Sequence, residues 1–472
     1  MRKYNFISYK NICIGCLQLM IAVLFIGCNS LVELDPPKTE VLASDVFKTD
    51  KNASAAVIGM YSSMITGASM LNIGYGCGLS ADENDGTNAI YPFTDFATNS
   101  LTSSDYGAQG YWTSFYQTIY QANSIIENAT ASTGMSDSIK TKVIGQAKFV
   151  RGLSLFYLVN MFGPVPLVVS TDVKTNRALS RAPIADIYAQ IISDLKDAEI
   201  KLPVDYTTYD NKRDKPIQKT ASALLAKVYL YTADYVNAEK KATEVINTTG
   251  LYKLLPTSEI GNVFLKDSKE SIYGLNTESS SGQRLTTEQY YYEYGSLYGS
   301  SYGSMYVMLP SLADAFESGD ARKTAWTGSF DYNGTTYYYD AKYKDYDGTS
   351  SPLEYSVVLR LSELYLIRAE ARVMQTDIPN GLSDLNTIRT RAGLANIQSA
   401  SKSDVLDAIM QERRVELFLE YGNRWFDLKR TGRADAVLSA LKPATWKSTA
   451  VLYPIPLTEI KTASQLTQNA GY

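Results

Sequence analysis

The sequence has 472 residues and contains no histidine. Histidine is the commonest general base near neutral pH and the usual metal ligand, so its absence excludes Ser/His and Cys/His nucleophiles and most zinc enzymes. Cysteine is scarce as well, with only Cys13, Cys16, Cys28 and Cys77, and the first two lie in an N-terminal leader. A cysteine-rich zinc site is therefore excluded, and we expect no metal, no cofactor and no catalytic residue.

An excess of positive charge is absent too. The chain carries 45 Lys and Arg against 49 Asp and Glu, a formal net charge of −4. Arg2, Lys3 and Lys10 are the only charged residues among the first 27, so the remainder is more acidic still. Binding to nucleic acid requires a basic face that displaces counterions from phosphates, and we therefore expect no nucleic-acid partner.

The N-terminus reads as a targeting segment. Three basic residues precede an apolar stretch over 12–26, which is short for a transmembrane helix and typical of a signal peptide. Its ending, Phe25-Ile26-Gly27-Cys28, resembles the lipobox of bacterial lipoproteins. We predict a lipoprotein signal peptide over 1–27, lipidation of Cys28, a lipid-anchor tether over 28–40 and a folded body over 41–472. The alternative is a plain secretory signal with an incidental cysteine.

Apolar residues recur with the period of an α-helix in two blocks, mainly 111–250 and 353–430, which predicts an all-α fold. In the first block Trp112, Phe115 and Ile119 form one stripe. A second long helix should end at Phe162-Gly163-Pro164, because proline cannot continue it. Further helices are expected over 184–202, 357–374, 381–391 and 404–420, with a helical hairpin over 220–247.

The hairpin over 220–247 alternates small and large residues in a tetratricopeptide-like way, with Ala223, Leu225 and Tyr229 before its turn and Ala238 and Ala242 after it. One such hairpin cannot bury its apolar face alone, so neighbouring hairpins stack into a curved scaffold. The sequence therefore predicts a tetratricopeptide-like helical-hairpin superhelix with long loop-rich insertions.

Two insertions, 62–110 and 251–350, are rich in Tyr, Gly, Ser and Thr and are expected to form the ligand region. Long loops on a rigid scaffold commonly carry function. Within 290–306 seven tyrosines occur, and the stretch 327–350 shares this character. Aromatic faces bind sugar rings through dispersion and C–H contacts, and a tyrosine adds a hydroxyl.

Several motifs that run in order along more than 400 residues resemble those of the SusD/RagB family of nutrient-binding lipoproteins. The motifs that carry the resemblance are Gln146-Ala147-Lys148-Phe149-Val150-Arg151, Phe162-Gly163-Pro164-Val165-Pro166, Glu412-Arg413-Arg414 with Glu416-Leu417, Arg424-Trp425-Phe426-Asp427-Leu428, Tyr453-Pro454-Ile455-Pro456 and the ending Gln468-Asn469-Ala470-Gly471-Tyr472. Trp112 and Trp425 match scaffold positions of the family.

The resemblance implies a non-enzymatic protein at the cell surface, anchored in the outer membrane by lipid. Such a protein would capture oligosaccharides and deliver them to a SusC-like TonB-dependent barrel transporter. The alternatives are a peptide-capturing, RagB-like member of the same family, a protein-interaction scaffold without a small ligand and, least favoured, a glycoside hydrolase.

The dense charges over 412–430 could suggest acid/base chemistry, but we interpret them as a structural network. Arg413 falls in an apolar stripe, so it should be half-buried and need a carboxylate partner, for which Glu370 or Glu416 would serve. Lys429, Arg430 and Arg433 form a modest basic cluster, interpreted as a solvated helix end.

The carboxylates of Asp82 and Glu83 are adjacent in sequence, and adjacent residues in a loop rarely face each other across a sugar, as glycosidase chemistry requires. Asp82 and Asn84 are better suited to hydrogen-bond sugar hydroxyls. The predicted ligand-binding residues are Asp82, Asn84, Tyr91, Phe93, Tyr290, Tyr292, Tyr294 and Trp326.

Overall fold

The computed structural model describes residues 43–65, 70–85, 93–277, 307–332, 334–344 and 353–472. The chain divides into two compact units, 1–46 and 47–472. Of the first unit only the short helix α2 (Ala43–Val46) is described. The predicted lipidation site Cys28 and the tether lie outside the described residues. Everything below concerns the second unit.

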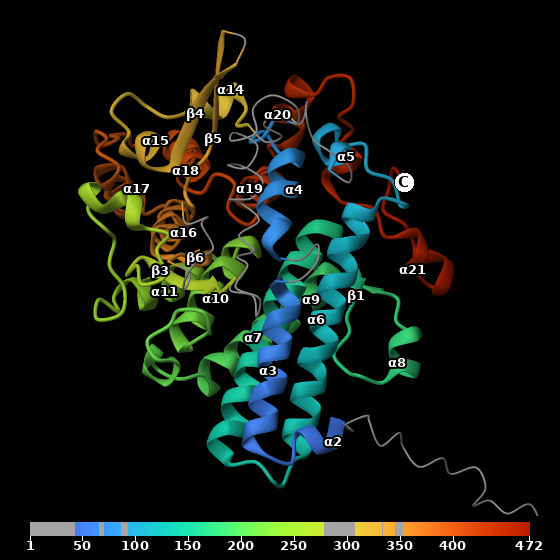
Figure 1. Ribbon diagram of the computed structural model, residues 1–472. Helices are drawn as coiled ribbons and strands as arrows, with labels where there is room; N and C mark the ends of the chain where they lie inside the picture. Colours follow the sequence, from blue (N-terminus) through green and yellow to red (C-terminus); the bar gives the residue numbers. More distant parts are fainter. Residues whose placement is uncertain (1–42, 66–69, 86–92, 278–306, 333, 345–352) are drawn as a thin grey trace, which may run out of the picture. The chain divides into compact units, whose positions relative to one another are not determined.

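Three long helices form one end of this unit (Figure 1). α6 (Tyr106–Ala131) and α7 (Asp137–Phe162) pack side by side, and α3 (Asp50–Ile65) lies against both. The predicted stripe on α6 is confirmed, because Trp112, Phe115 and Ile119 are buried. α7 ends as predicted before Gly163, whose φ of +74° favours glycine.

The apolar stretch Asp50–Ser80 is long enough to cross a membrane by length and composition alone. Buried helices of soluble proteins meet the same criterion, and the described part of this stretch is divided between α3 and a separate helix, α4 (Ile73–Ser80). Because α3 packs on α6 and α7, we interpret it as a core helix.

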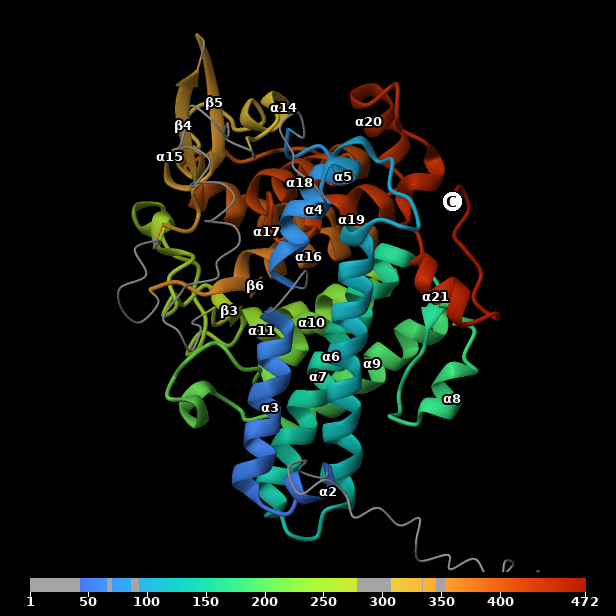
Figure 2. The ribbon, with the colours of Figure 1, turned by 45° about the vertical axis from the view of Figure 1, so that its right-hand side comes forward.

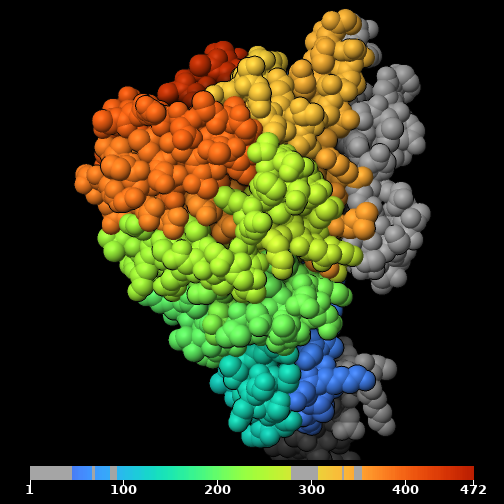
Figure 3. All heavy atoms as spheres, turned by 90° about the vertical axis from the view of Figure 1, so that its left-hand side faces the viewer, coloured from blue at the N-terminus to red at the C-terminus, as the bar shows by residue number. Residues whose placement is uncertain are grey.

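The remaining hairpins continue the stack. α7 packs on α9 (Ile184–Lys201), α9 on α10 (Gln218–Tyr231), and α10 on α11 (Tyr235–Ile246). α11 then packs on α16 (Leu361–Met374), which pairs with α17 (Ile378–Arg391). Figure 3 shows this order on one face as successive bands from cyan through green to orange. The all-α, tetratricopeptide-like fold is therefore confirmed.

The turns of two hairpins are built alike. Ala233 and Thr376 adopt positive φ angles of 57° and 71°, and each is followed by an aspartate that caps the next helix. Asp234 accepts a hydrogen bond from the backbone N–H of Asn237, and Asp377 accepts one from that of Asn380. The same local chemistry thus closes two helical repeats far apart in sequence.

The C-terminal part supplies α18 (Lys402–Glu416), α19 (Asn423–Arg430), α20 (Ala434–Leu441) and α21 (Leu457–Thr462). α18 ends four residues earlier than predicted, because Leu419, Tyr421 and Gly422 all have positive φ, which a helix does not allow. α16, α17 and α18 enclose an apolar core cluster that includes Leu366, Leu385 and Ile409.

Strands are few and short. β1 (Val165–Pro166) pairs with β2 (Arg181–Ala182), β3 (Ser271–Leu275) with β6 (Ser356–Arg360), and β4 (Thr327–Tyr332) with β5 (Thr335–Asp340), all antiparallel. The expected helix over 357–374 is therefore wrong at its start, where Val357–Arg360 belongs to β6. Pairing with β3 fixes these residues in an extended conformation.

The insertions predicted to be loop-rich contain short elements in their described parts. These are the helices α4, α5 (Thr94–Thr98), α14 (Pro310–Ala313) and α15 (Ala321–Trp326), the 3₁₀ turns Met70–Asn72 and Thr257–Asn262, and strands β3, β4 and β5. The small helix α8 (Val173–Arg177) and the 3₁₀ turns Tyr206–Tyr209 and Ser448–Val451 complete the described elements. In Figures 1 and 2 the β4–β5 hairpin and α8 lie on opposite sides of the unit.

Candidate ligand-binding site

Three segments expected to belong to the ligand region meet through backbone hydrogen bonds. The amide of Asp85 donates to the carbonyl of Val307 at 2.9 Å, and the amide of Leu309 donates to the carbonyl of Glu83 at 2.8 Å. The amide of Met308 then donates to the carbonyl of Tyr338 on β5 at 2.7 Å. The segment after α4, the segment before α14 and the β4–β5 hairpin therefore form one continuous junction.

Asp82 lies at this junction but is only 4% exposed. Its carboxylate accepts two hydrogen bonds from Arg424, at 2.7 and 2.9 Å, and pairs with Arg414 at 3.1 Å. Burial alone would raise the pKa of Asp82, but the two arginines lower it overall. The carboxylate is thus committed to ion pairs inside the protein.

The other described candidates are buried as well. Asn84 is enclosed, and its backbone bridges that of Met308. Phe93 packs edge-on against Tyr75, with ring centroids 4.6 Å apart. Asp82 and Asn84 are buried at the junction and Phe93 is buried beside α4, so the expectation that they contact a ligand directly does not agree with this arrangement.

Trp326 also requires correction, because it is fully buried. Its indole N–H donates to the carbonyl of Ile260 at 2.9 Å. Its ring lies between charged groups, with Arg360 and Arg391 each 5.5 Å from the ring centroid. Trp326 therefore belongs to the scaffold. The remaining predicted residues, Tyr91, Tyr290, Tyr292 and Tyr294, lie outside the described residues.

A network of buried ion pairs surrounds Trp326. Glu416 is fully enclosed and contacts Arg322 at 2.7 Å, and it also pairs with Arg360 and Arg391. Burial would raise its pKa, but the three guanidinium groups hold it well below the usual range. The prediction of a structural network over 412–430 agrees with this geometry.

The partner predicted for Arg413 is wrong. Arg413 donates to Asp427 at 2.7 Å, whereas Glu370 pairs with Arg430 and Glu416 pairs with Arg322. Lys429 and Arg430 also differ from a solvated helix end, because both turn into the body. Of that basic cluster, Arg433 is the residue that stays at the surface, 38% exposed and paired with Asp407.

Glu83 is the other buried carboxylate of the junction. It accepts a hydrogen bond from the backbone N–H of Leu419 at 3.0 Å. Burial raises its pKa to about 8, aided by the charge of Asp82, so it is largely protonated at neutral pH.

In the described parts of the chain, no three His, Cys, Asp or Glu side chains gather as a metal site would require.

The β4–β5 hairpin carries an aromatic face that sequence analysis did not select. Phe330 and Tyr337 are directly opposite each other and stack with centroids 5.5 Å apart and planes inclined by 19°. Tyr339 lies on the same face, over Gly328, where a side chain would collide with its ring. All three rings are half-buried. We call Phe330, Tyr337 and Tyr339 the hairpin aromatic face.

The signal for this hairpin is present in the sequence. Asn333-Gly334 separates two runs that contain aromatic residues, and an Asn-Gly pair between such runs is a strong short-range hairpin signal. Alternation places every second residue on one face, so Phe330, Tyr337 and Tyr339 could have been grouped before the structure. Tyr338 points to the other face, where Lys323 lies 5.1 Å from its ring centroid.

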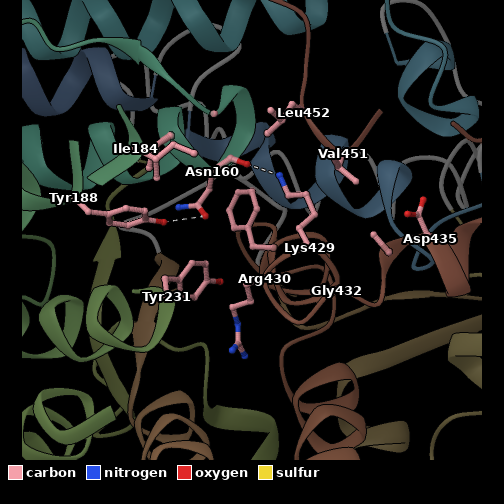
Figure 4. Close-up of a pocket in the computed structure, with 14 residues that line it drawn as sticks. Asn160, Ile184, Tyr188, Tyr231, Lys429, Arg430, Gly432, Asp435, Val451 and Leu452 are labelled. Atoms are coloured by element: carbon pink, nitrogen blue, oxygen red, sulfur yellow. Dashed lines mark hydrogen bonds between the residues drawn. The ribbon is translucent and has the colours of Figure 1, made fainter. Parts of the chain in front are cut away.

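A pocket of about 350 Å³ lies elsewhere, between α7, α9 and α19 (Figure 4). Tyr188 donates to the side-chain oxygen of Asn160 at 3.2 Å, and Lys429 donates to the backbone carbonyl of the same residue. Burial lowers the pKa of Lys429 to about 7. These contacts join α7 to α9 and α19, and we interpret the pocket as part of their packing.

A helical-repeat scaffold that carries half-buried aromatic rings on a hairpin is typical of a binding protein. Comparison with known proteins agrees. Residues 57–230 match the family described as "Starch-binding associating with outer membrane", and residues 316–472 match the SusD family. The chain belongs to the SusD/RagB family of outer-membrane-associated, non-catalytic nutrient-binding proteins.

Individual relatives cover nearly the whole chain. SusD-like protein P2 of Formosa agariphila is 28% identical, over 96% of this chain and 98% of that protein. A crystal structure of a SusD-like protein from Bacteroides fragilis matches with a TM-score of 0.78 and 21% identity, covering 93% of this chain and all of that one. A laminarin-binding SusD-like protein matches with a TM-score of 0.73 and 25% identity, covering 89% and 99%.

Proposed function

We propose that the protein binds oligosaccharides at the cell surface and passes them to a SusC-like TonB-dependent outer-membrane transporter. The observation that carries the proposal is the stacked, half-buried pair Phe330 and Tyr337 on the β4–β5 hairpin. Two nearly parallel rings, with their planes inclined by 19°, offer a broad apolar surface, on which a sugar ring packs through its C–H groups.

The junction at the hairpin supports this assignment. Backbone bonds from Met308 to β5, and from Asp85 to Val307, bring the described flanks of 86–92 and 278–306 to the base of the hairpin. We therefore retain Tyr91, Tyr290, Tyr292 and Tyr294 as proposed ligand contacts. The laminarin-binding relative, at 25% identity, supports a glycan ligand.

The proposed location follows from the N-terminus. Cys28 would carry the lipid, because it follows the lipobox-like residues Phe25-Ile26-Gly27. Its acyl chains would hold the protein at the membrane, since each buried CH₂ contributes about 0.8 kcal/mol to membrane binding. Metabolic labelling with a radioactive fatty acid should mark the wild-type protein and not a Cys28→Ala variant, which should also leave the membrane fraction. Equal labelling of both would remove the anchor from the proposal.

Binding is tested by isothermal titration calorimetry of the chain without residues 1–28 against a panel of glucans and host glycans. Phe330→Ala combined with Tyr337→Ala should weaken binding at least tenfold, as should Tyr290→Ala combined with Tyr294→Ala. Tyr338→Ala is the matched control, because its ring lies on the opposite face of the same strand.

The bound glycan should be recovered uncut. Binding that the hairpin variants leave unchanged would refute the hairpin as the site. No detectable binding to any glycan, together with binding to peptides, would favour the peptide-capturing alternative. No detectable binding to either class would favour the protein-interaction scaffold.

A further inference from the structure

A second groove, of about 760 Å³, lies on the side of the unit away from the β4–β5 hairpin. Its walls are α6, the segment 165–179 that contains α8, and α21 with the residues that follow it. Figure 2 shows α6, α8 and α21 on this side. The volume falls within the range of about 300 to 1,000 Å³ that is usual for small-molecule sites.

The floor of this groove is an aromatic ladder on α6. Trp112, Tyr116 and Tyr120 follow one another at intervals of four residues, so they share a face and rise by about 6 Å at each step. The rings of Trp112 and Tyr116 are 4.9 Å apart. Exposure increases along the ladder, from the buried Trp112 through the half-buried Tyr116 to Tyr120, which is 51% exposed.

Hydrogen bonds between the walls hold the groove in shape. Tyr116 donates to the carbonyl of Pro166 at 2.8 Å, and Glu127 of α6 accepts from the backbone N–H of Thr171 at 2.9 Å. Gln465 donates to the carbonyl of Leu179 at 3.1 Å. A groove preorganised in this way loses little free energy to ordering when a ligand binds.

Other polar groups of the groove are left for a ligand. Within the part of the chain that the structure describes, the side chains of Gln117, Tyr120 and Arg177 form no hydrogen bond or ion pair, although all three line the groove. An amide, a hydroxyl and a guanidinium can together donate to and accept from hydroxyl groups. Arg177 and Glu459 are the charged residues among the lining residues, and their charges are opposite.

We infer that this groove is a second binding site, for a neutral oligosaccharide. The rings of the half-buried Tyr116 and the exposed Tyr120, bordered by the amide of Gln117, match successive sugar rings, whose faces are apolar and whose edges carry hydroxyls. Balanced charge disfavours an anionic or cationic ligand. The choice of ligand class rests on the proposed function, but the groove shares no residue with the hairpin aromatic face.

The test places a reporter in the groove. Thr113 is exposed and lines it, so a Thr113→Cys variant can be labelled with an environment-sensitive fluorophore, while the one other cysteine of the chain without residues 1–28, Cys77, is buried. Laminarihexaose and maltohexaose are titrated as probes. We expect a saturable change in fluorescence that Tyr120→Ala shifts to a five- to tenfold higher ligand concentration. Tyr106→Ala, on the same helix, 67% exposed and outside the groove, should have no effect.

Two outcomes would overturn the inference: no saturable signal with either hexasaccharide, or a signal that Tyr120→Ala does not shift. A signal with an uncharged, acetylated peptide and none with saccharides would likewise assign the groove to another ligand class. Calorimetry separates this inference from the first site. If calorimetry detects saccharide binding but the fluorophore at position 113 gives no signal, only the groove proposal is refuted. If the fluorophore responds and Phe330→Ala leaves the calorimetric binding unchanged, only the hairpin proposal is refuted.

Discussion

Replacing Glu83 by glutamine should make the stability of the protein less dependent on pH. Burial raises the pKa of Glu83 to about 8, from a usual value near 4.5. Between these values the folded protein holds a proton that the unfolded chain has released, so the stabilisation from this group is fully present below pH 4.5 and is lost as the pH rises through 8. Glutamine mimics the protonated acid and cannot ionise.

The magnitude follows from linkage. With pKa values of 4.5 unfolded and 8 folded, raising the pH from 5 to 8 removes about 3 to 4 kcal/mol of wild-type stability through this residue alone. Glu83→Gln should keep the hydrogen bond from the Leu419 N–H and match the wild type within about 1 kcal/mol at pH 5. At pH 8 it should be more stable than the wild type by roughly 3 kcal/mol.

Urea unfolding at pH 5 and pH 8, followed by tryptophan fluorescence, measures both differences. The comparison with the variant is essential, because burial also raises the pKa of Asp340, to about 7, and that group titrates in the same direction. Glu259→Gln, at an exposed position, serves as the control and should change stability by less than about 0.5 kcal/mol at either pH. An equal effect of Glu83→Gln at both pH values would refute the reasoning.

Four further substitutions test the scaffold by urea unfolding at pH 7. Glu416→Gln leaves three buried arginines short of a charge and should cost about 3 to 5 kcal/mol, whereas Arg433→Ala at a surface pair should cost less than about 1 kcal/mol; equal losses would contradict the network. Trp326→Ala empties a fully buried site and should cost about 3 to 5 kcal/mol, and a smaller loss would mean the ring is not core. Gly163→Ala should lower the free energy of unfolding by about 1 to 2 kcal/mol, because φ is +74° and the new Cβ would lie 2.8 Å from Leu452. An unchanged free energy of unfolding would show that the end of α7 relaxes freely.

Helices of the scaffold could be predicted wherever the local sequence alone determines the conformation of the segment. The stripe on α6 and the Gly163-Pro164 stop after α7 depend on local period and backbone chemistry alone. Val357 to Arg360 could not be assigned in this way, because a short apolar run suits a buried strand and a helix equally. Its partner β3 decides the outcome, and that pairing is not visible in the run itself.

The candidate site was harder to predict, because exposure decides it and is a property of the whole fold. Trp326 and Phe330 are both aromatic residues of one segment, but the first is enclosed by Arg360 and Arg391 and the second lies on a hairpin. Likewise, Arg413 had several carboxylates within reach along the sequence, and the backbone path after α18 selects Asp427. Long-range packing makes both choices.

The buried charges and the hairpin aromatic face depend on one another. β4 begins directly after Trp326, which the guanidinium groups of the network hold in place. Beyond the end of β5, the ammonium group of Lys342 pairs with Glu420 at 2.7 Å and also donates to the carbonyl of Phe418. Both ends of the hairpin are therefore fixed by charges that cannot leave their partners without a large desolvation penalty. A dense cluster of carboxylates and arginines in this chain thus holds both ends of the hairpin and positions the aromatic face that we propose as the ligand-binding surface.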